Sequence, residues 1–102
     1  MVIKYVKIEK ITEGSKKFKA IFYDENKKKV KTTSFGAKGY DDYTIHKDDK
    51  RKERYMNRHK KNEDWNDYTT AGSLSRFILW NKKTIGESVN DYIKRFGLLK
   101  YV

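Results

Sequence analysis

The chain has 102 residues, of which 25 are Lys or Arg and 14 are Asp or Glu, so its formal net charge is +11, an excess that attracts polyanions. It has no cysteine, which excludes disulfides and thiolate metal sites. No apolar run approaches the ~20 residues that span a bilayer. We therefore expect an intracellular protein that is neither secreted nor inserted in a membrane. The length fits one domain over residues 1–102, and the 15% share of aromatic residues favours a packed core over disorder.

The first 35 residues predict a β meander. Val6 and Ile8 alternate with charged residues, and the apolar residues of 18–22 do the same, so each run can bury one face and expose the other. A third run over 30–35 completes three antiparallel strands, whose lysines are expected mainly on the exposed face. Two turns are predicted, at 13–15 and 24–26.

Residues 36–43 form a connector rich in Gly and Tyr between the strands and a helical half, residues 44–97. Gly36 and Gly39 would let the backbone approach a phosphate, but their spacing fits neither a phosphate-binding loop nor a dinucleotide-binding motif. We interpret the connector as a crossover loop and keep phosphate contact as the alternative.

A first helix is predicted over residues 47–61, because no residue in this stretch breaks a helix. Thr44 is the expected N-cap. Asp48 and Asp49 lie in the first turn, where carboxylates suit the helix dipole.

Two further helices have clearer boundaries. Residues 73–81 place apolar side chains on one face, and Thr70 is available as the N-cap. Thr84 and Glu87 form a capping-box pattern ahead of an apolar stripe, and Gly97 provides the C-terminal stop. Together the elements predict an α+β fold, with an N-terminal three-stranded antiparallel sheet followed by about three helices, of which the last two pack on the sheet.

Basic residues gather along one side of the first predicted helix, within an arc of roughly 100° at about 100° per residue. Like charges four residues apart disfavour an isolated helix, and a phosphate backbone would offset this repulsion. Tyr55, Met56 and His59 form a thin core face on the other side, so the helix should lie on the surface, where a merely solvated charged face is the alternative. The candidate nucleic-acid-binding residues are Lys47, Lys50, Arg51, Arg54, Arg58 and Lys61.

The two histidines, His46 and His59, belong to no metal-binding motif. We expect His59 to be half-buried and bonded to a carboxylate or to the backbone, as histidines commonly are. Asp41 and Asp42 could join the acids of the first helix in a metal-dependent nuclease. Adjacent acids ahead of a basic helix more commonly serve as caps and counter-charges, so we predict no metal site.

Three aromatic residues are candidates for stacking on bases beside a basic groove: Trp65, Tyr68 and Trp80. A place in the core is the commoner role. Trp80 continues an apolar run and is expected to be buried, whereas Trp65 is set among Asn and Asp and is expected to be exposed or to lie in an interface.

Short motifs between Ser34 and Phe96 carry a resemblance. They are Phe35-Gly36, Gly39-Tyr40, Asp42-Tyr43-Thr44, His46-Lys47-Asp48, Tyr55, Arg58-His59, Trp65, Ala71-Gly72, Leu79-Trp80-Asn81 and Thr84. Together they resemble a family of short basic proteins of unknown function from large double-stranded DNA viruses of protists (giant viruses), whereas residues 1–33 show no such resemblance. The resemblance implies a setting and no activity: a virion packed with DNA, or a viral factory in the host cytoplasm.

We therefore predict a non-enzymatic viral protein that binds the DNA backbone without sequence preference, with packaging in the virion as a further expectation. The expected partners are nucleic acid and a second copy of the chain in a homodimer, with no membrane, cofactor, metal or small-molecule substrate. Two alternatives remain open. One is a virion scaffold or protein-interaction module whose charge meets acidic proteins, and the other is a small metal-dependent nuclease that uses Asp41, Asp42 and His59.

Overall fold

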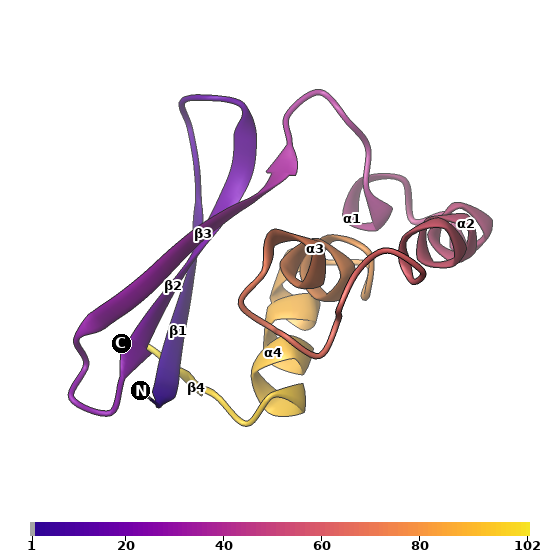
Figure 1. Ribbon diagram of the computed structural model, residues 1–102. Coiled ribbons are helices and arrows are strands. Elements are labelled where there is room, and N and C mark those ends of the chain that lie inside the picture. Colours follow the sequence, from indigo (N-terminus) through magenta and orange to yellow (C-terminus); the bar gives the residue numbers. More distant parts are fainter. Residues whose placement is uncertain (1) are drawn as a thin grey trace.

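A sheet of four strands, in the order β3-β2-β1-β4, forms one side of the molecule in the computed structural model, which describes residues 2–102 (Figure 1). β1 (Ile3–Lys10), β2 (Lys16–Asp24) and β3 (Lys29–Ala37) form the antiparallel meander that their alternation predicts. The short β4 (Leu99–Lys100) pairs in parallel with β1 and adds a strand to the three that were predicted.

One face of the sheet carries the core. The strand register places Val6 opposite Phe22 and Phe18 opposite Phe35, and all but Phe18 of these four are buried. Burial of a large apolar side chain stabilises the fold by about 1.5–3 kcal/mol. Residues 74–98 contribute the other side of the core with Leu74, Phe77, Ile78, Leu79, Tyr92 and Leu98.

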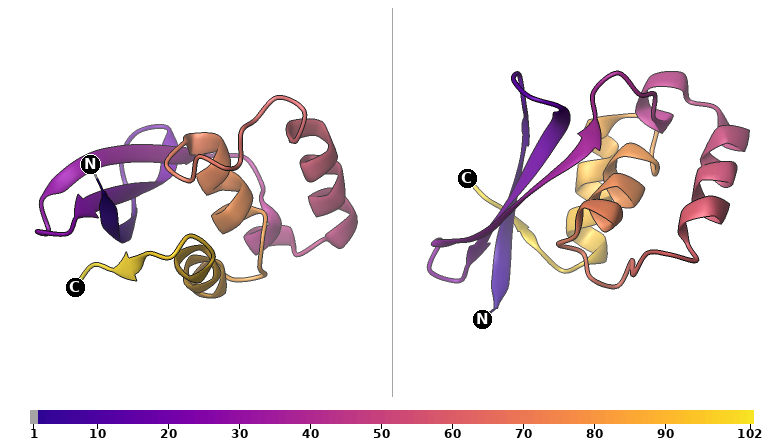
Figure 2. Two further views of the ribbon diagram at one scale, coloured as in Figure 1. Left: turned by 60° about the horizontal axis from the view of Figure 1, so that its bottom comes forward. Right: turned by 45° about the horizontal axis from the view of Figure 1, so that its top comes forward.

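Five helical segments lie between the strands β3 and β4 within the described residues. They are α1 (Tyr43–His46), α2 (Asp49–His59), α3 (Ala71–Leu74), the π-helix η1 (Ser75–Leu79) and α4 (Ile85–Arg95). Figures 1 and 2 show α3 and α4 against the sheet, with α1 and α2 on the side of them that faces away from it. The predicted α+β fold is thus confirmed. None of the helices in residues 2–102 is long and apolar enough to cross a bilayer.

The capping residues of the last two helices are confirmed. Thr70 accepts a hydrogen bond from the backbone N–H of Ser73 at the start of α3, and Thr84 accepts one from Glu87 at the start of α4. Gly97 ends α4 with φ 65°, a left-handed conformation that costs glycine little. Its N–H reaches the carbonyl of Lys94, and the next N–H reaches that of Ile93, which is the pairing of a Schellman motif.

The predicted helix over 47–61 is wrong in extent and in its cap. Lys47 adopts a left-handed conformation with φ 57°, and its N–H closes α1 by donating to the Tyr43 carbonyl. Asp42, not Thr44, caps α1, and Asp48 caps α2 by accepting from the backbone N–H groups of Lys50 and Arg51. The physical reason is that an Asp side chain accepts hydrogen bonds from the free backbone N–H groups at a helix start, so Asp42 and Asp48 each begin a separate helix.

The π-helix η1 explains why three successive residues enter the core. The N–H of Trp80 donates to the carbonyl of Ser75, five residues earlier, at 3.0 Å. The wider turn directs Phe77, Ile78 and Leu79 all inward. Trp80, predicted to be buried, lies beyond this turn and is half-buried instead.

Candidate functional site

The six predicted binding residues fall into three groups. Lys50, Arg54 and Arg58 are exposed and lie four residues apart along α2, and we call them the α2 basic face. Arg51 is half-buried, with a guanidinium nitrogen 3.6 Å from an Asp41 carboxylate oxygen. The other two lie outside the helix, at the C-cap of α1 (Lys47) and in the turn after α2 (Lys61).

Two acidic residues at the start of α2, Asp48 and Asp49, have hydrogen-bond partners there. The backbone N–H of Arg51 is the main cause that holds the pKa of Asp48 below its ordinary value, and the charges of His46 and Arg54 act in the same direction. Asp49 accepts a hydrogen bond from the Tyr43 hydroxyl at 2.5 Å. The ion pairs found in residues 2–102 include no member of the α2 basic face.

A stack of rings attaches α2 to the rest of the protein. The ring of Tyr55 lies parallel to the indole of Trp80, and His59 stacks on the other side of Tyr55 with centroids 4.2 Å apart. Burial raises the pKa of Tyr55 well above its ordinary value, so the hydroxyl stays protonated. Lys52 also points inward, where its ammonium group donates to the Asn81 carbonyl at 2.7 Å, and desolvation lowers its pKa.

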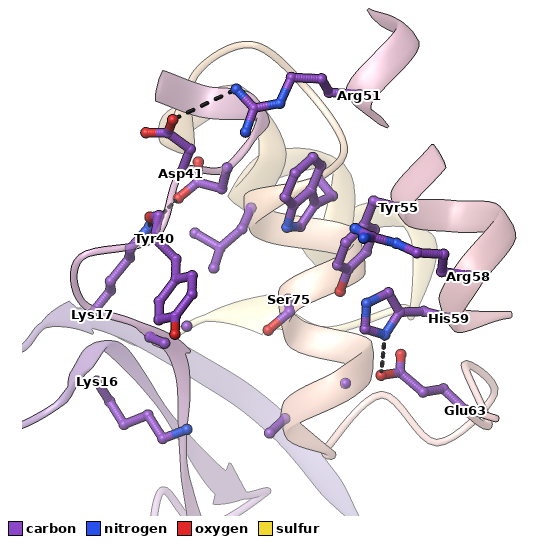
Figure 3. Close-up of a pocket in the computed structure, with 17 residues that line it drawn as sticks. Lys16, Lys17, Tyr40, Asp41, Arg51, Tyr55, Arg58, His59, Glu63 and Ser75 are labelled. Atoms are coloured by element: carbon purple, nitrogen blue, oxygen red, sulfur yellow. Dashed lines mark hydrogen bonds and ion pairs between the residues drawn. The ribbon is translucent and has the colours of Figure 1, made fainter. Parts of the chain in front are cut away.

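A cleft of about 520 Å³ lies beside this stack, between α2 and the end of the sheet. In Figure 3, Arg58, His59 and Tyr55 form one wall, and Lys16, Lys17 and Tyr40 form the other, with Ser75 between them. Small residues leave the space open along the strand end and the floor: Gly36, Ala37, Ala71 and Gly72. The cleft therefore joins residues from β2, the connector, α2 and η1.

Two of the small residues permit close approach of neighbouring groups. Gly36 has φ 76°, and a Cβ there would lie 2.7 Å from Cδ1 of the buried Leu79. A Cβ on Gly72 would lie 2.9 Å from the carboxyl carbon of Glu63. Glycine is thus required for the backbone conformation at 36 and favoured by the contact at 72.

The acids of the cleft are held by neighbouring groups. Asp42 is buried, accepts from the Lys17 ammonium at 2.7 Å and caps α1 through Thr44. Lys17 also donates to the carbonyl of Tyr40, which ties the connector to β2. The prediction that Asp41 and Asp42 serve as counter-charge and cap is confirmed. No group of three His, Asp or Glu side chains in residues 2–102 is placed to hold a metal ion.

His59 has the ordinary role that we predicted. It is half-buried, and its Nδ1 lies 3.1 Å from a carboxylate oxygen of Glu63. The other oxygen of Glu63 accepts from the indole N–H of Trp65 at 2.8 Å. Trp65, predicted to be exposed or to lie in an interface, is half-buried, with the guanidinium of Arg76 5.5 Å from its ring.

Of the proposed stacking residues, Tyr68 is half-buried and packs against the core, where its ring stacks on Phe96. Tyr40 also lines the cleft and was not among the predicted stacking residues. It is 73% exposed at the rim of the cleft, and its backbone is fixed by hydrogen bonds to Lys17 and Ala37. Its position after a glycine in a loop was the available signal, because an aromatic residue there has no strand or helix to bury it.

Comparison with known proteins gives one match. A model of a family of unknown function (DUF5754) matches residues 6–59, more than half of the chain, whereas no curated protein and no solved structure matches. The match runs from β1 to the end of α2 and so includes the strands, for which the motifs above gave no resemblance. It therefore covers the α2 basic face and the β2, connector and α2 walls of the cleft. The chain belongs to the family of unknown function DUF5754.

Proposed function

We propose that this protein binds nucleic acid, with DNA as the expected partner, through phosphate contacts made by the α2 basic face and without sequence preference or catalysis. The observation that carries the proposal is the state of Lys50, Arg54 and Arg58: all three are exposed, and none is in an ion pair within residues 2–102. α2 also lies at an edge of the molecule (Figure 2), where a long polymer can reach it.

The spacing of these residues suits a polyanion. Residues four apart are about 6 Å apart along a helix axis, so the three cations form a short row. Their mutual repulsion costs a few tenths of a kcal/mol per pair in the free protein, and phosphates would relieve it. Binding would release counterions from the nucleic acid, so the affinity would fall steeply with salt. Base-edge contacts are not needed for such binding.

The setting is part of the proposal. The resemblance to proteins of large DNA viruses favours a role in the infected cell or in the virion, where a cationic protein neutralises or organises the genome. We also propose a homodimer. The half-buried Ile8, Ile85 and Val89 border a groove of about 440 Å³ between β1 and α4, which a second copy would cover. Sedimentation equilibrium tests this, and a monomer at all concentrations would refute it.

The binding proposal is tested by filter binding of a random duplex across a salt series. We expect the triple variant Lys50→Gln, Arg54→Gln and Arg58→Gln to bind more weakly, with a slope of log affinity against log salt reduced by roughly 0.9 per lost phosphate contact. The matched control is Lys28→Gln, Lys83→Gln and Lys94→Gln, which removes the same charge from exposed sites outside α2.

Two results would contradict the proposal: a wild-type affinity that does not change with salt, or an equal loss in both triple variants. The melting temperature of the α2 variant should stay nearly unchanged, since exposed substitutions of this kind typically change stability by less than about 0.5 kcal/mol. The alternatives have their own readouts. A scaffold would keep its protein partner after nuclease treatment of an extract, and a nuclease would cut plasmid with Mg²⁺ or Mn²⁺.

A further inference from the structure

The cleft beside α2 presents cations on two opposite walls. Lys16 lies on the β2 wall and Arg58 on the α2 wall (Figure 3), and both are exposed. Neither belongs to an ion pair within residues 2–102, although the neighbouring Lys17 and Arg51 are both paired with aspartates. A polyanionic strand that crosses the cleft would thus meet a free positive charge at each side.

Aromatic rings line the same space. Tyr40 is 73% exposed at the rim of the cleft. The Lys17 ammonium donates to its backbone carbonyl, so the backbone that carries the ring is held in place. Across the cleft, His59 ends the ring stack that begins at Trp80. The hydroxyl groups of Tyr55 on the α2 wall and of Ser75 between the walls also line the cleft (Figure 3), and both can donate to a sugar or a phosphate.

We propose that this cleft holds one nucleotide of a single-stranded nucleic acid, with the base against Tyr40 and the flanking phosphates at Lys16 and Arg58. The proposal rests on the proposed function and narrows it, because it makes a single strand the preferred ligand. A basic groove with aromatic side chains is the usual design of single-strand binding surfaces.

The shape of the cleft favours a single strand over a duplex. Its volume of about 520 Å³ is that of a site for a small molecule, for which about 300–1,000 Å³ is typical. A duplex keeps its bases paired and stacked inside, so they cannot reach Tyr40 without being flipped out. The bases of a single strand are free to stack on a side chain. A duplex can still use the α2 basic face, which lies outside the cleft except for Arg58.

The test compares a labelled oligothymidylate 12-mer with a random 12-base-pair duplex at one salt concentration, by fluorescence anisotropy. Wild-type protein should bind the single strand on the order of tenfold more tightly. Tyr40→Ala should remove most of this preference, since stacking of one base contributes about a tenfold or larger effect. Tyr40→Phe keeps the ring and should restore the preference. Ile45→Ala, another exposed apolar residue outside the cleft, is the matched control and should behave as wild type.

The outcomes separate this inference from the proposed function. If both ligands bind equally well and Tyr40→Ala changes nothing, the cleft proposal is overturned and backbone binding stands. If Tyr40→Ala weakens both ligands alike, the cleft does not select single strands and the proposal also fails. If neither ligand binds, the proposed function fails with it. Thymidine monophosphate should compete poorly, and competition as effective as that of the oligomer would identify a free-nucleotide site instead.

Discussion

Tyr55 of α2 lies flat on Trp80, with ring centroids 4.3 Å apart and planes 3° from parallel. Tyr55 is the buried residue of α2, so this contact anchors the helix that carries the α2 basic face. Tyr55→Ala should lower the free energy of unfolding by about 3 kcal/mol, because a large buried ring is lost. Tyr55→Phe keeps the stack and should change it by less than about 0.5 kcal/mol. Urea denaturation measures the free energy of unfolding of both variants. An equal loss in the two would show that the hydroxyl, not the ring stack, holds α2 in place.

Gly36 and Gly39 form a matched pair for testing the contact at the cleft. Both have positive φ, but a Cβ at 36 would meet Leu79, whereas a Cβ at 39 would have nothing within 4 Å. Gly39→Ala should cost on the order of 1 kcal/mol for backbone strain alone. Gly36→Ala should cost about 1–3 kcal/mol more, because the buried Leu79 has little room to move. If both variants lose the same free energy of unfolding in thermal denaturation, Leu79 moves enough to make room for the added Cβ.

The Lys17–Asp42 ion pair is nearly buried, with 14% and 3% of the two side chains exposed. Lys17→Met leaves the carboxylate without its cation and should destabilise the protein by roughly 2–3 kcal/mol, somewhat less than a fully buried pair because Thr44 still donates to Asp42. Adding Asp42→Asn should recover part of this loss, since Asn can cap α1 without a charge. A double variant less stable than Lys17→Met alone, by chemical denaturation, would contradict the account.

The pH dependence of stability should reflect the cap of α2. Hydrogen bonding, chiefly from the backbone N–H of Arg51, lowers the pKa of Asp48 in the folded protein relative to the value of about 3.9 in an unfolded chain. The ionised Asp48 therefore contributes fully to the free energy of unfolding above about pH 5, and this contribution is lost as the pH falls through the pKa of Asp48 in the folded protein.

Asp48→Asn retains a capping oxygen but not the charge. Wild-type protein should melt above this variant at pH 7, and the difference should shrink at pH 3. A constant difference between the two pH values would show that the charge of Asp48 has no part in capping.

Local chemistry accounts for the predictable parts of the fold. Thr70, Thr84 and Gly97 were identified because each boundary depends on one side chain or one φ angle close in sequence. The break between helices at Lys47 was not predicted, because a lysine in the sequence gives no sign of a left-handed backbone conformation. It depends on Asp48 starting a second helix immediately afterwards.

The three residues of the α2 basic face could be predicted from the sequence, and the cleft could not. Helical spacing alone identifies Lys50, Arg54 and Arg58 as neighbours. The cleft depends on α2 docking opposite β2, and the stack of Tyr55 on Trp80 that docks it is a tertiary contact with no local pattern. For the same reason the position of Lys16 across the cleft from Arg58 could not be predicted.

The pairing of β4 with β1 has a consequence for how the chain reaches this structure. Tyr5 pairs with Leu99, so nearly all of the described chain lies between the two partners. Bringing such distant segments together costs conformational entropy that local hairpins do not incur, and contacts of this kind form slowly. We therefore expect Tyr5 and Val6 at the outer edge of β1 to stay unpaired on that side while β2 and β3 are already in place. During this interval the unpaired backbone groups of Tyr5 and Val6 can accept a strand from a neighbouring chain, a route to aggregation that pairing with β4 removes.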